Sequence, residues 1–416
     1  MKKRVIIVGG GASGLMCAIS AAENCDVIIL EKNDKVAKKV MITGKGRCNV
    51  TNNCDVDALI SAAVSNGRFL YSAFSAFNSQ DTMDFFENSG VPLKTERGNR
   101  VFPVSDKAAD IVNALKRRAT ESGCEIRTNS SVKDVILKDS SAVGVVLENG
   151  EKIYADAVVI ATGGVSYPLT GSTGDGYRFA KKAGHTVIAP IPSLVPFTVY
   201  EQDICSSLSG LSLKNVRLTV YDTSKNKKLF SELGEMLFTH TGISGPLVLS
   251  ASAHTRPMEK GRYSAVIDLK PAIDFDTLDR RLLRDFGDNI NRDFVNSLSD
   301  LLPKSIIPVI IEMSGIPPRV KVNSVTKEQR KALCETIKGM KLSIKGFRPI
   351  DEAIVTAGGV KVSEVDPRTM MSKKIRSLYF VGEVLDIDSY TGGYNLQNAF
   401  STGYLAGESI KAGENL

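Results

Sequence analysis

The chain has few of the residues from which metal sites and disulfide frameworks are built. Its 416 residues include only three histidines and seven cysteines, and no two cysteines have the C-x-x-C spacing. An odd and scattered set of cysteines argues against a disulfide framework and against an iron–sulfur or zinc cluster. We therefore expect reduced thiols in a cytoplasmic protein, and no metal site.

Long apolar runs are also missing, and no stretch approaches the ~18 apolar residues of a membrane span. Residues 2–4 are basic and precede an apolar run, as in a secretory signal peptide. That run ends in the glycines of 9–11, inside a motif that the mature protein needs. We expect no membrane partner.

The excess of positive charge is small. Lysine and arginine number 53 and aspartate and glutamate 46, a net charge of +7. This balance suits anionic ligands but is far below the charge typical of a nucleic-acid-binding protein. We expect a small-molecule substrate, no nucleic-acid partner, and a monomer or homodimer.

The first forty residues contain the most informative pattern. An apolar strand, 5–8, leads into Gly9, Gly11 and Gly14 in the spacing G-x-G-x-x-G. A helix follows, and a second apolar strand, 27–30, ends on Glu31. This order of strand, glycine turn, helix, strand and acid is typical of a dinucleotide-binding unit.

Each part of the pattern has a physical role. Gly9 permits the tight turn, Gly11 lets backbone N–H groups approach a pyrophosphate, and Gly14 lets the helix pack close to the sheet. The helix from Ala12 points its positive N-terminus at the phosphates. Glu31 accepts hydrogen bonds from the adenosine ribose.

A length of 416 residues predicts two or three domains. Apolar strands at 158–161 and 378–381 resemble those of the first unit and lie on either side of a proline-punctuated middle. We therefore expect an α/β fold with a discontinuous dinucleotide-binding domain, 1–190 and 347–416. Its insert, 191–346, has β-like runs at about 191–272 and 340–346 and a helical part at about 274–339. The last helix is expected after Asn395.

Three features favour FAD over NAD. There is one glycine fingerprint, a Thr162-Gly163-Gly164 turn follows a later strand, and Gly382-Glu383 follows the last strand. In flavoproteins with this domain, an acid after the last strand contacts the ribityl chain. The next helix then points its N-terminus at the flavin ring edge that becomes negative on reduction.

Four longer motifs carry a family resemblance. They are Thr43-Gly44-Lys45-Gly46-Arg47-Cys48-Asn49-Val50-Thr51-Asn52, Ala161-Thr162-Gly163-Gly164-Val165-Ser166-Tyr167-Pro168, Phe238-Thr239-His240-Thr241-Gly242-Ile243-Ser244-Gly245-Pro246 and Gly392-Gly393-Tyr394-Asn395-Leu396-Gln397-Asn398-Ala399. The sequence resembles, over its full length, a bacterial family of NAD(P)/FAD-dependent oxidoreductases. Members include BaiN-type 3-dehydro-bile acid delta(4,6)-reductases and aminoacetone oxidases.

The resemblance implies a glutathione-reductase-like FAD domain interrupted by a β-barrel that carries a small helical bundle. It also implies that the loop from Lys39 to Asn52 lies along the flavin ring. The residues expected to contact FAD are Gly9, Gly11, Ala12, Ser13, Gly14, Glu31, Lys32, Lys39, Thr43, Gly44, Gly46, Arg47, Cys48, Asn49, Val132, Ala161, Thr162, Gly163, Gly382, Glu383, Asn395 and Leu396.

Three residues are candidates for catalysis. His240 lies in a turn rich in small residues and is a candidate proton donor; the alternative is a structural histidine that holds the turn. Tyr394 is a second candidate donor, and Arg47 could stabilise the reduced ring. Cys48 has no partner cysteine at usable spacing, which favours a buried structural thiol over a redox role.

We expect FAD to be reduced by NAD(P)H and then to reduce an activated C=C bond, as in a 3-oxo steroid or bile-acid-like enone. One alternative is a flavin oxidase of a small amino ketone. Another is a nucleic-acid-modifying flavoprotein, because the helical part carries Lys327, Arg330, Lys331, Lys338 and Lys341. Acidic residues between these cations favour a solvated helix face instead.

Overall fold

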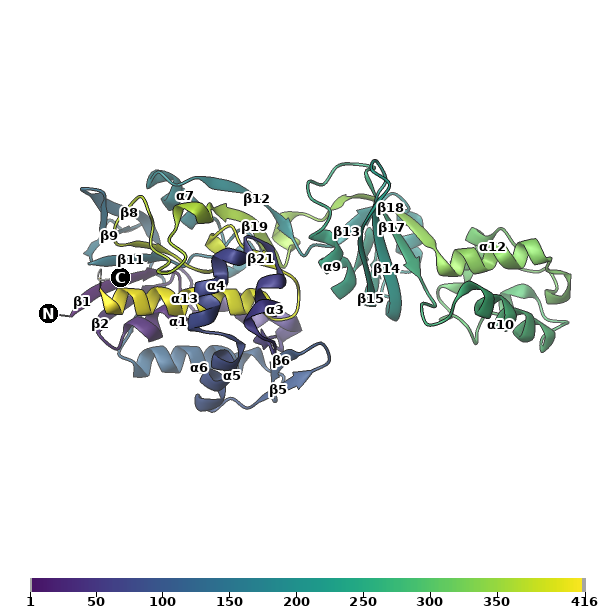
Figure 1. Cartoon of the computed structure of the whole chain (residues 1–416), viewed down its shortest axis with the longest axis horizontal. Helices are drawn as coiled ribbons and strands as arrows, with labels where there is room; N and C mark the ends of the chain where they lie inside the picture. The colour runs from purple at the N-terminus through teal and green to yellow at the C-terminus, as the bar shows by residue number, and fades with distance from the viewer. Residues whose placement is uncertain (1, 414–416) are drawn as a thin grey trace. The chain divides into compact units, whose positions relative to one another are not determined.

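The computed structural model describes residues 2–413, and the chain divides into two compact units (Figure 1). The first unit is formed by residues up to Ser193 and from Pro349 onward, and the second by Leu194–Arg348. The first unit is therefore discontinuous in sequence. No helix among the described residues has the length and apolar character needed to cross a membrane.

A five-stranded parallel sheet forms the centre of the first unit, in the order β20-β11-β1-β2-β7. Helix α1 (Ala12–Ala21) packs against β1 and β2 of this sheet, and α6 (Ala108–Glu121) and α13 (Tyr394–Ala412) pack against α1. The strands are β1 (Lys3–Val8), β2 (Cys25–Leu30), β7 (Glu125–Arg127), β11 (Ala157–Ile160) and β20 (Leu378–Phe380). Parallel sheets buried on both faces have nearly continuous apolar strands, which is why these strands are readable in the sequence.

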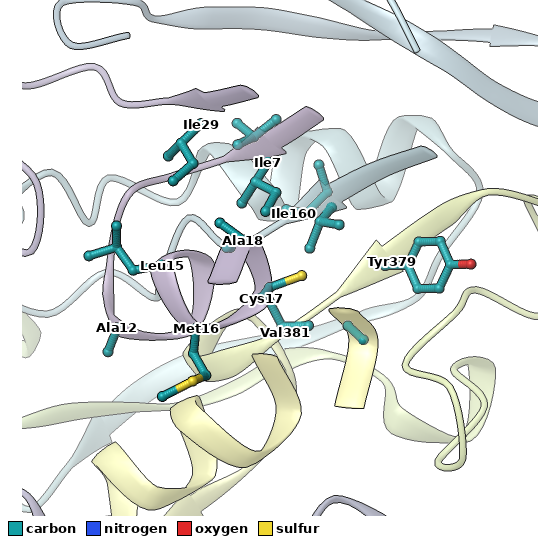
Figure 2. Packing of buried hydrophobic residues seen from close by; sticks show 14 of the residues in the cluster. Ile7, Ala12, Leu15, Met16, Cys17, Ala18, Ile29, Ile160, Tyr379 and Val381 are labelled. Carbon is teal, nitrogen blue, oxygen red and sulfur yellow. The ribbon is translucent and has the colours of Figure 1, made fainter. Parts of the chain in front are cut away.

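The core of this unit lies between the sheet and α1. Figure 2 shows Ile7, Ile29 and Ile160 from three neighbouring strands together with Leu15 and Ala18 of α1. All five side chains are buried. Each Å² of apolar surface removed from water contributes about 25 cal/mol, so this cluster stabilises the packing of α1 on the sheet.

Smaller elements surround the sheet. Two short three-stranded sheets are formed by β3 (Thr51–Asn52), β6 (Arg100–Pro103) and β5 (Leu93–Glu96), and by β10 (Lys152–Tyr154), β9 (Ser141–Leu147) and β8 (Val132–Lys138). Two strand pairs are formed by β12 (Val187–Ser193) with β19 (Val355–Val360), and by β21 (Asp388–Ser389) with β4 (Ala63–Ser65). The remaining helices are α2 (Lys38–Ile42), α3 (Val56–Ser61), α4 (Tyr71–Ala76), α5 (Ser79–Asn88) and α7 (Asp175–Lys182).

The second unit contains a closed barrel in the order β13-β16-β15-β14-β17-β18. Its strands are β13 (Phe197–Val199), β14 (Ser212–Asp222), β15 (Lys227–Thr239), β16 (Gly242–Ser244), β17 (Tyr263–Asp268) and β18 (Met340–Phe347), with α8 (Gln202–Ser207) and α9 (Pro246–Ser252) beside them. A helical part, α10 (Phe275–Gly287), α11 (Ile307–Ser314) and α12 (Lys327–Lys338), lies between β17 and β18 in sequence. The predicted α/β class with a barrel and a helical bundle is confirmed.

Two details differ from the sequence prediction. The segment from Lys39, expected as a loop, is partly helical, because α2 spans Lys38–Ile42. The last helix begins at Tyr394 rather than after Asn395, since Gly393 at φ 99° is its N-terminal boundary. Only glycine adopts such a φ at low cost, so the glycine pair sets the helix start.

Helices α1 and α13 approach closely because glycines face the backbone of α1. A Cβ on Gly403 would lie 2.3 Å from the Ser13 carbonyl oxygen, and one on Gly407 would lie 2.7 Å from the Cys17 carbonyl oxygen. Such distances are well inside van der Waals contact. The two helices can therefore be this close only if both positions lack a side chain.

We predict that Gly403→Ala destabilises the protein. Alanine favours a helix over glycine by about 1 kcal/mol, but overpacking against a backbone oxygen costs about 1–3 kcal/mol, so the net loss of stability is up to about 2 kcal/mol. Thermal unfolding should show Tm lowered by several degrees. Gly287→Ala is the matched control, because a Cβ there would have no described atom within 4 Å outside its chain neighbours and the backbone of its own helix. Equal Tm values for the two variants would contradict the packing argument.

Candidate functional site

In the glycine turn after β1, Gly9, Gly11 and Gly14 each have different surroundings. Gly9 has φ 107°, and a Cβ there would lie 2.5 Å from the Ala161 carbonyl oxygen. A Cβ on Gly14 would lie 2.0 Å from the Gly9 carbonyl oxygen. A Cβ on Gly11, by contrast, would have no atom of the described residues within 4 Å apart from its immediate neighbours in the chain. Gly11 thus faces open space, where a ligand can approach the backbone.

The N-terminus of α1 opens at the same place. Gly11 is its N-terminal boundary residue, and no side chain of the described residues caps the first turn, which begins with Ala12 and Ser13. The first amides of a helix have no acceptor within the helix, and the helix dipole makes this end positive. The uncapped turn and the open space at Gly11 together fit a pyrophosphate.

Glu31 lies at the end of β2, buried beside this turn. Its Oε2 accepts a hydrogen bond from the Gly10 N–H at 2.9 Å, and its Oε1 accepts two from Asn33, each at 2.8 Å. A carboxylate can accept about four hydrogen bonds, so capacity for a ribose hydroxyl remains. Lys32 has a different environment, because it forms an ion pair with Asp175 at 2.8 Å.

A second cluster joins four segments of the first unit around Glu383. Its Oε2 pairs with Lys39 Nζ at 2.7 Å, and its Oε1 accepts from the Thr356 N–H at 2.8 Å and from Ser166 Oγ at 3.1 Å. Lys39 also donates to Ser166 Oγ at 2.6 Å. Gly382, with φ 73°, turns the chain after β20 so that Glu383 can reach these partners. The structure therefore brings the predicted Lys39 and Glu383 together.

Sequence reasoning did not single out Ser166 or Thr356. Ser166 lies in one of the four family motifs, so a signal for it was present. Thr356 lies in β19 without a surrounding motif. Its hydroxyl accepts hydrogen bonds from the N–H groups of Val165 at 2.9 Å and Ser166 at 3.2 Å. These partners are distant in sequence, so only the folded chain shows the contact.

The turn after β11 contributes backbone more than side chains. The Ala161 carbonyl faces Gly9, and Gly163 has φ 72°. The Thr162 hydroxyl is buried with no hydrogen-bond partner in the described part of the chain. A Cβ on Gly176 of α7 would lie 2.2 Å from that hydroxyl, so the Thr162 hydroxyl lies against α7.

The segment 43–49 has an unusual backbone. A short 3₁₀ turn, Thr43–Gly46, contains left-handed residues, and Gly46 at φ 82° has no atom of the described chain within 4 Å of its Cβ position. Thr43 donates its hydroxyl to the Val40 carbonyl at 2.7 Å. Asn49 Oδ1 is buried without a partner among residues 2–413. A left-handed turn with an open face, followed by this amide oxygen, fits a loop that binds a ligand.

Cys48 is fully buried, and burial raises its thiol pKa to about 12. Almost none of it is thiolate at neutral pH, so the structural role that the sequence favoured fits its environment.

Arg47 belongs to an ionic network. Its guanidinium pairs with Glu96 at 2.5 Å and Asp106 at 2.7 Å, and it lies 4.2 Å from the centre of the Phe102 ring. Hydrogen bonds to these two carboxylates raise the pKa of Arg47. Its charge is therefore offset by the protein itself, which reduces what it can contribute to an anionic ligand.

The N-terminus of α13 is also uncapped by any described side chain. Tyr394 begins this helix, half-buried, and burial raises its pKa. Asn395 holds the preceding turn by bonding Ser389 through both ends of its amide, at 2.8 and 3.0 Å. Leu396 packs against the core of the unit.

A buried amide in the same helix was not predicted. Gln397 is fully buried, and its Oε1 accepts hydrogen bonds from Thr51 at 2.6 Å and Thr82 at 2.9 Å. Gln397 stands inside a family motif but was not separated from its neighbours, since nothing in the sequence shows where Thr82 lies.

The remaining predicted residues lie elsewhere. Val132 begins β8 and is buried. His240 lies in the second unit, in the turn between β15 and β16, with an exposed side chain. Tyr394 and His240 thus belong to different units.

We predict that Gly11→Val folds but loses FAD. The open space at Gly11 accommodates the side chain in the apoprotein, but the same side chain would fill the place of the pyrophosphate. Flavin content after purification should fall to background while the Tm of the apoprotein is kept. Glu31→Ala should weaken FAD binding by a smaller amount, about 1.5–3 kcal/mol. Full flavin content in Gly11→Val would contradict the assignment of this turn.

Comparisons with known proteins agree on the fold. The family described as HI0933-like protein Rossmann domain matches residues 3–409. A 3-ketosteroid-delta4-(5alpha)-dehydrogenase from Rhodococcus jostii has a similar fold, with a TM-score of 0.53 at 14% identity over 98% of this chain and 97% of that one. A 3-ketosteroid delta1-dehydrogenase from Sterolibacterium denitrificans gives 0.52 at 13% identity over 99% of both chains.

Curated relatives match over the whole length. A 3-dehydro-bile acid delta(4,6)-reductase from Clostridium scindens is 32% identical over 98% of each chain. A ribosomal RNA dihydrouridine synthase from Escherichia coli is 31% identical over 99% of this chain and 98% of its own. The predicted family resemblance is confirmed. The chain belongs to the HI0933-like Rossmann family.

Proposed function

We propose that this protein uses FAD and NAD(P)H to reduce a carbon–carbon double bond conjugated to a carbonyl group. The proposal depends on the similarity of the whole chain to a delta(4,6)-reductase and to a dihydrouridine synthase. Both names describe the reduction of a carbon–carbon double bond. A delta(4,6)-reductase of a 3-dehydro bile acid removes double bonds next to a ketone. A dihydrouridine synthase saturates the ring double bond of uridine, which is also conjugated to a carbonyl.

The first unit supplies the groups that would hold the cofactor. The uncapped α1 terminus and the space at Gly11 suit the pyrophosphate, and Glu31 suits the ribose. The uncapped terminus of α13 suits the electron-rich edge of the ring. When bound, FAD supplies a ring nitrogen that exchanges hydride with a nicotinamide and with an electron-poor carbon.

Reduction of a conjugated double bond also needs a proton at the second carbon, and two side chains are candidates. Tyr394 is half-buried, and because burial raises its pKa it keeps its proton at neutral pH. His240 has an exposed imidazole in a turn of small residues, and imidazoles as a class exchange protons near neutral pH. We propose His240 as the first candidate and Tyr394 as the second.

Two substrates fit this reaction. A bile-acid-like enone is our first candidate, following the relative from Clostridium scindens. Uridine in ribosomal RNA is the second, following relatives from Escherichia coli and Haemophilus influenzae that match over 97–99% of this chain. Both are electron-poor double bonds, so one flavin site could serve either one.

We predict that NADH or NADPH bleaches the flavin absorbance under anaerobic conditions, and that a conjugated acceptor restores it. A 3-oxo-Δ4 steroid and an unmodified ribosomal RNA transcript are the two acceptors to compare. Mass spectrometry should detect a product with two added hydrogen atoms. Gly11→Val, which lacks flavin, is the control. Restoration by oxygen alone would contradict the reductase and favour the oxidase of a small amino ketone.

We predict that His240→Asn slows the oxidative half-reaction on the order of 10²- to 10⁴-fold and leaves reduction by NAD(P)H unchanged. His254→Asn, which removes an imidazole from the same unit, should change neither half-reaction. Stopped-flow absorbance measures the two steps separately. If His240→Asn impairs both steps together and lowers Tm, the histidine is structural. If it has no effect while Tyr394→Phe slows reoxidation, Tyr394 is the donor.

A further inference from the structure

Positive charge is concentrated in the second unit. Residues 194–348 hold 23 lysines and arginines against 17 aspartates and glutamates. Six of the seven net positive charges of the chain therefore lie in this unit, which has little more than a third of the residues. Averaging over the whole chain hides this concentration.

Within this unit, one face of α10 lines an open groove of about 410 Å³. The groove is lined by Ile273, Thr277, Arg280, Arg281 and Arg284. The last four are spaced by three, one and three residues, which places them on one face of a helix. The opposite face, Leu278, Leu282 and Phe286, is buried, so α10 is held in place with its arginines outward.

The acids around the groove offset only part of this charge. Asp285 is shared, at 3.4 Å from Arg281 and 3.1 Å from Arg284. Arg280 bonds the Thr277 hydroxyl at 3.2 Å, and no described carboxylate pairs with it. Asp274, at the start of α10, accepts a hydrogen bond from the Thr277 N–H at 2.7 Å. Arg281 and Arg284 thus share one carboxylate, and Arg280 acts on Asp274 only through its charge, which, after the hydrogen bonds from Thr277, helps to lower the pKa of that carboxyl. The Arg284 side chain is 69% exposed.

Lys270 adds positive charge near the arginines of α10. The pKa of Lys270 is lowered, first by burial and then by the charge of Arg281, which places these two cations near each other. The cations of α12 differ, because Arg330 pairs with Asp279 at 2.5 Å and Lys338 with Asp268 at 2.7 Å. The basic groove is therefore on α10, whereas the sequence analysis considered the cations of α12.

We propose that the α10 groove binds the phosphate backbone of RNA. The inference rests on the proposed function, of which it favours the RNA-linked uridine substrate. Guanidinium groups form paired hydrogen bonds with phosphate oxygens, and a row of them on one helix face matches a repeating anion better than an isolated one. Phosphate contacts position a nucleic acid without reading its bases, which suits a groove of arginines with no aromatic lining.

The test compares RNA binding by two double variants that each remove two positive charges. Arg280→Gln/Arg284→Gln removes charge from the groove. Lys227→Gln/Lys228→Gln removes charge from exposed positions of β15 in the same unit. The probe is a fluorescently labelled ribosomal RNA hairpin, titrated into the holoprotein at several salt concentrations with fluorescence anisotropy as the readout.

We expect the groove variant to bind RNA about 10- to 50-fold more weakly at moderate salt, with the slope of log K against log salt reduced by roughly 1.5. The β15 variant should lose less than about threefold, as expected for distant charge alone. Flavin content, Tm and enone reduction should be unchanged in both variants. This combination would support the proposal.

Three results would overturn it: no measurable RNA binding by the natural chain, equal losses in both variants, or competition by polyglutamate as strong as by RNA. The last result would point to an acidic protein partner. RNA binding through the arginines in a protein that reduces neither acceptor would support the groove and contradict the proposed function. Reduction of the steroid without RNA binding would support the proposed function and contradict the groove.

Discussion

The close contact of α1 with the glycine turn and with α13 is the constraint on which the first unit depends. A Cβ on Gly14 would lie 2.0 Å from the Gly9 carbonyl oxygen, and a Cβ on Gly403 would lie 2.3 Å from the Ser13 carbonyl oxygen. Side chains at these positions would push the helix away from the turn. The helix amides would then no longer converge with Gly11 and Glu31. The same glycines that allow tight packing thus position the end of α1 that we propose binds the pyrophosphate.

Charged and polar side chains complete the site by joining segments that are far apart in sequence. Glu383, after β20, is bonded to Lys39, Ser166 and Thr356, which come from three other segments. Ser166 and Thr356 are fully buried, and a buried polar group left without a partner costs about 1–3 kcal/mol. Lys39 is therefore both a predicted ligand contact and part of the scaffold, and Arg47, paired with Glu96 and Asp106, is chiefly the latter.

Much of this architecture was predictable because it depends on local pattern. Gly9, Gly11 and Gly14 have the environments that their spacing implies, and the apolar strands of the sheet were readable. The partners of Arg47 and the bonds of Thr356 and Gln397 were not, since each depends on which distant segments fold together. The basic face of α10 follows from local spacing and was overlooked in favour of the cations at 327–341. Strand β15 lies within the predicted barrel region, but its bounds were not readable, because most of its side chains are not buried and the apolar alternation is weak.

The most direct test of the account is hydrogen–deuterium exchange of the apoprotein and the FAD-bound protein, because it reports on the amides that we assign to the cofactor. Bound FAD should slow exchange at residues 11–14, at the start of α1, and at 394–397, at the start of α13. The barrel strands β14 and β15 should be unchanged and serve as the internal reference. Protection elsewhere in the chain, with none at these two helix starts, would contradict the account.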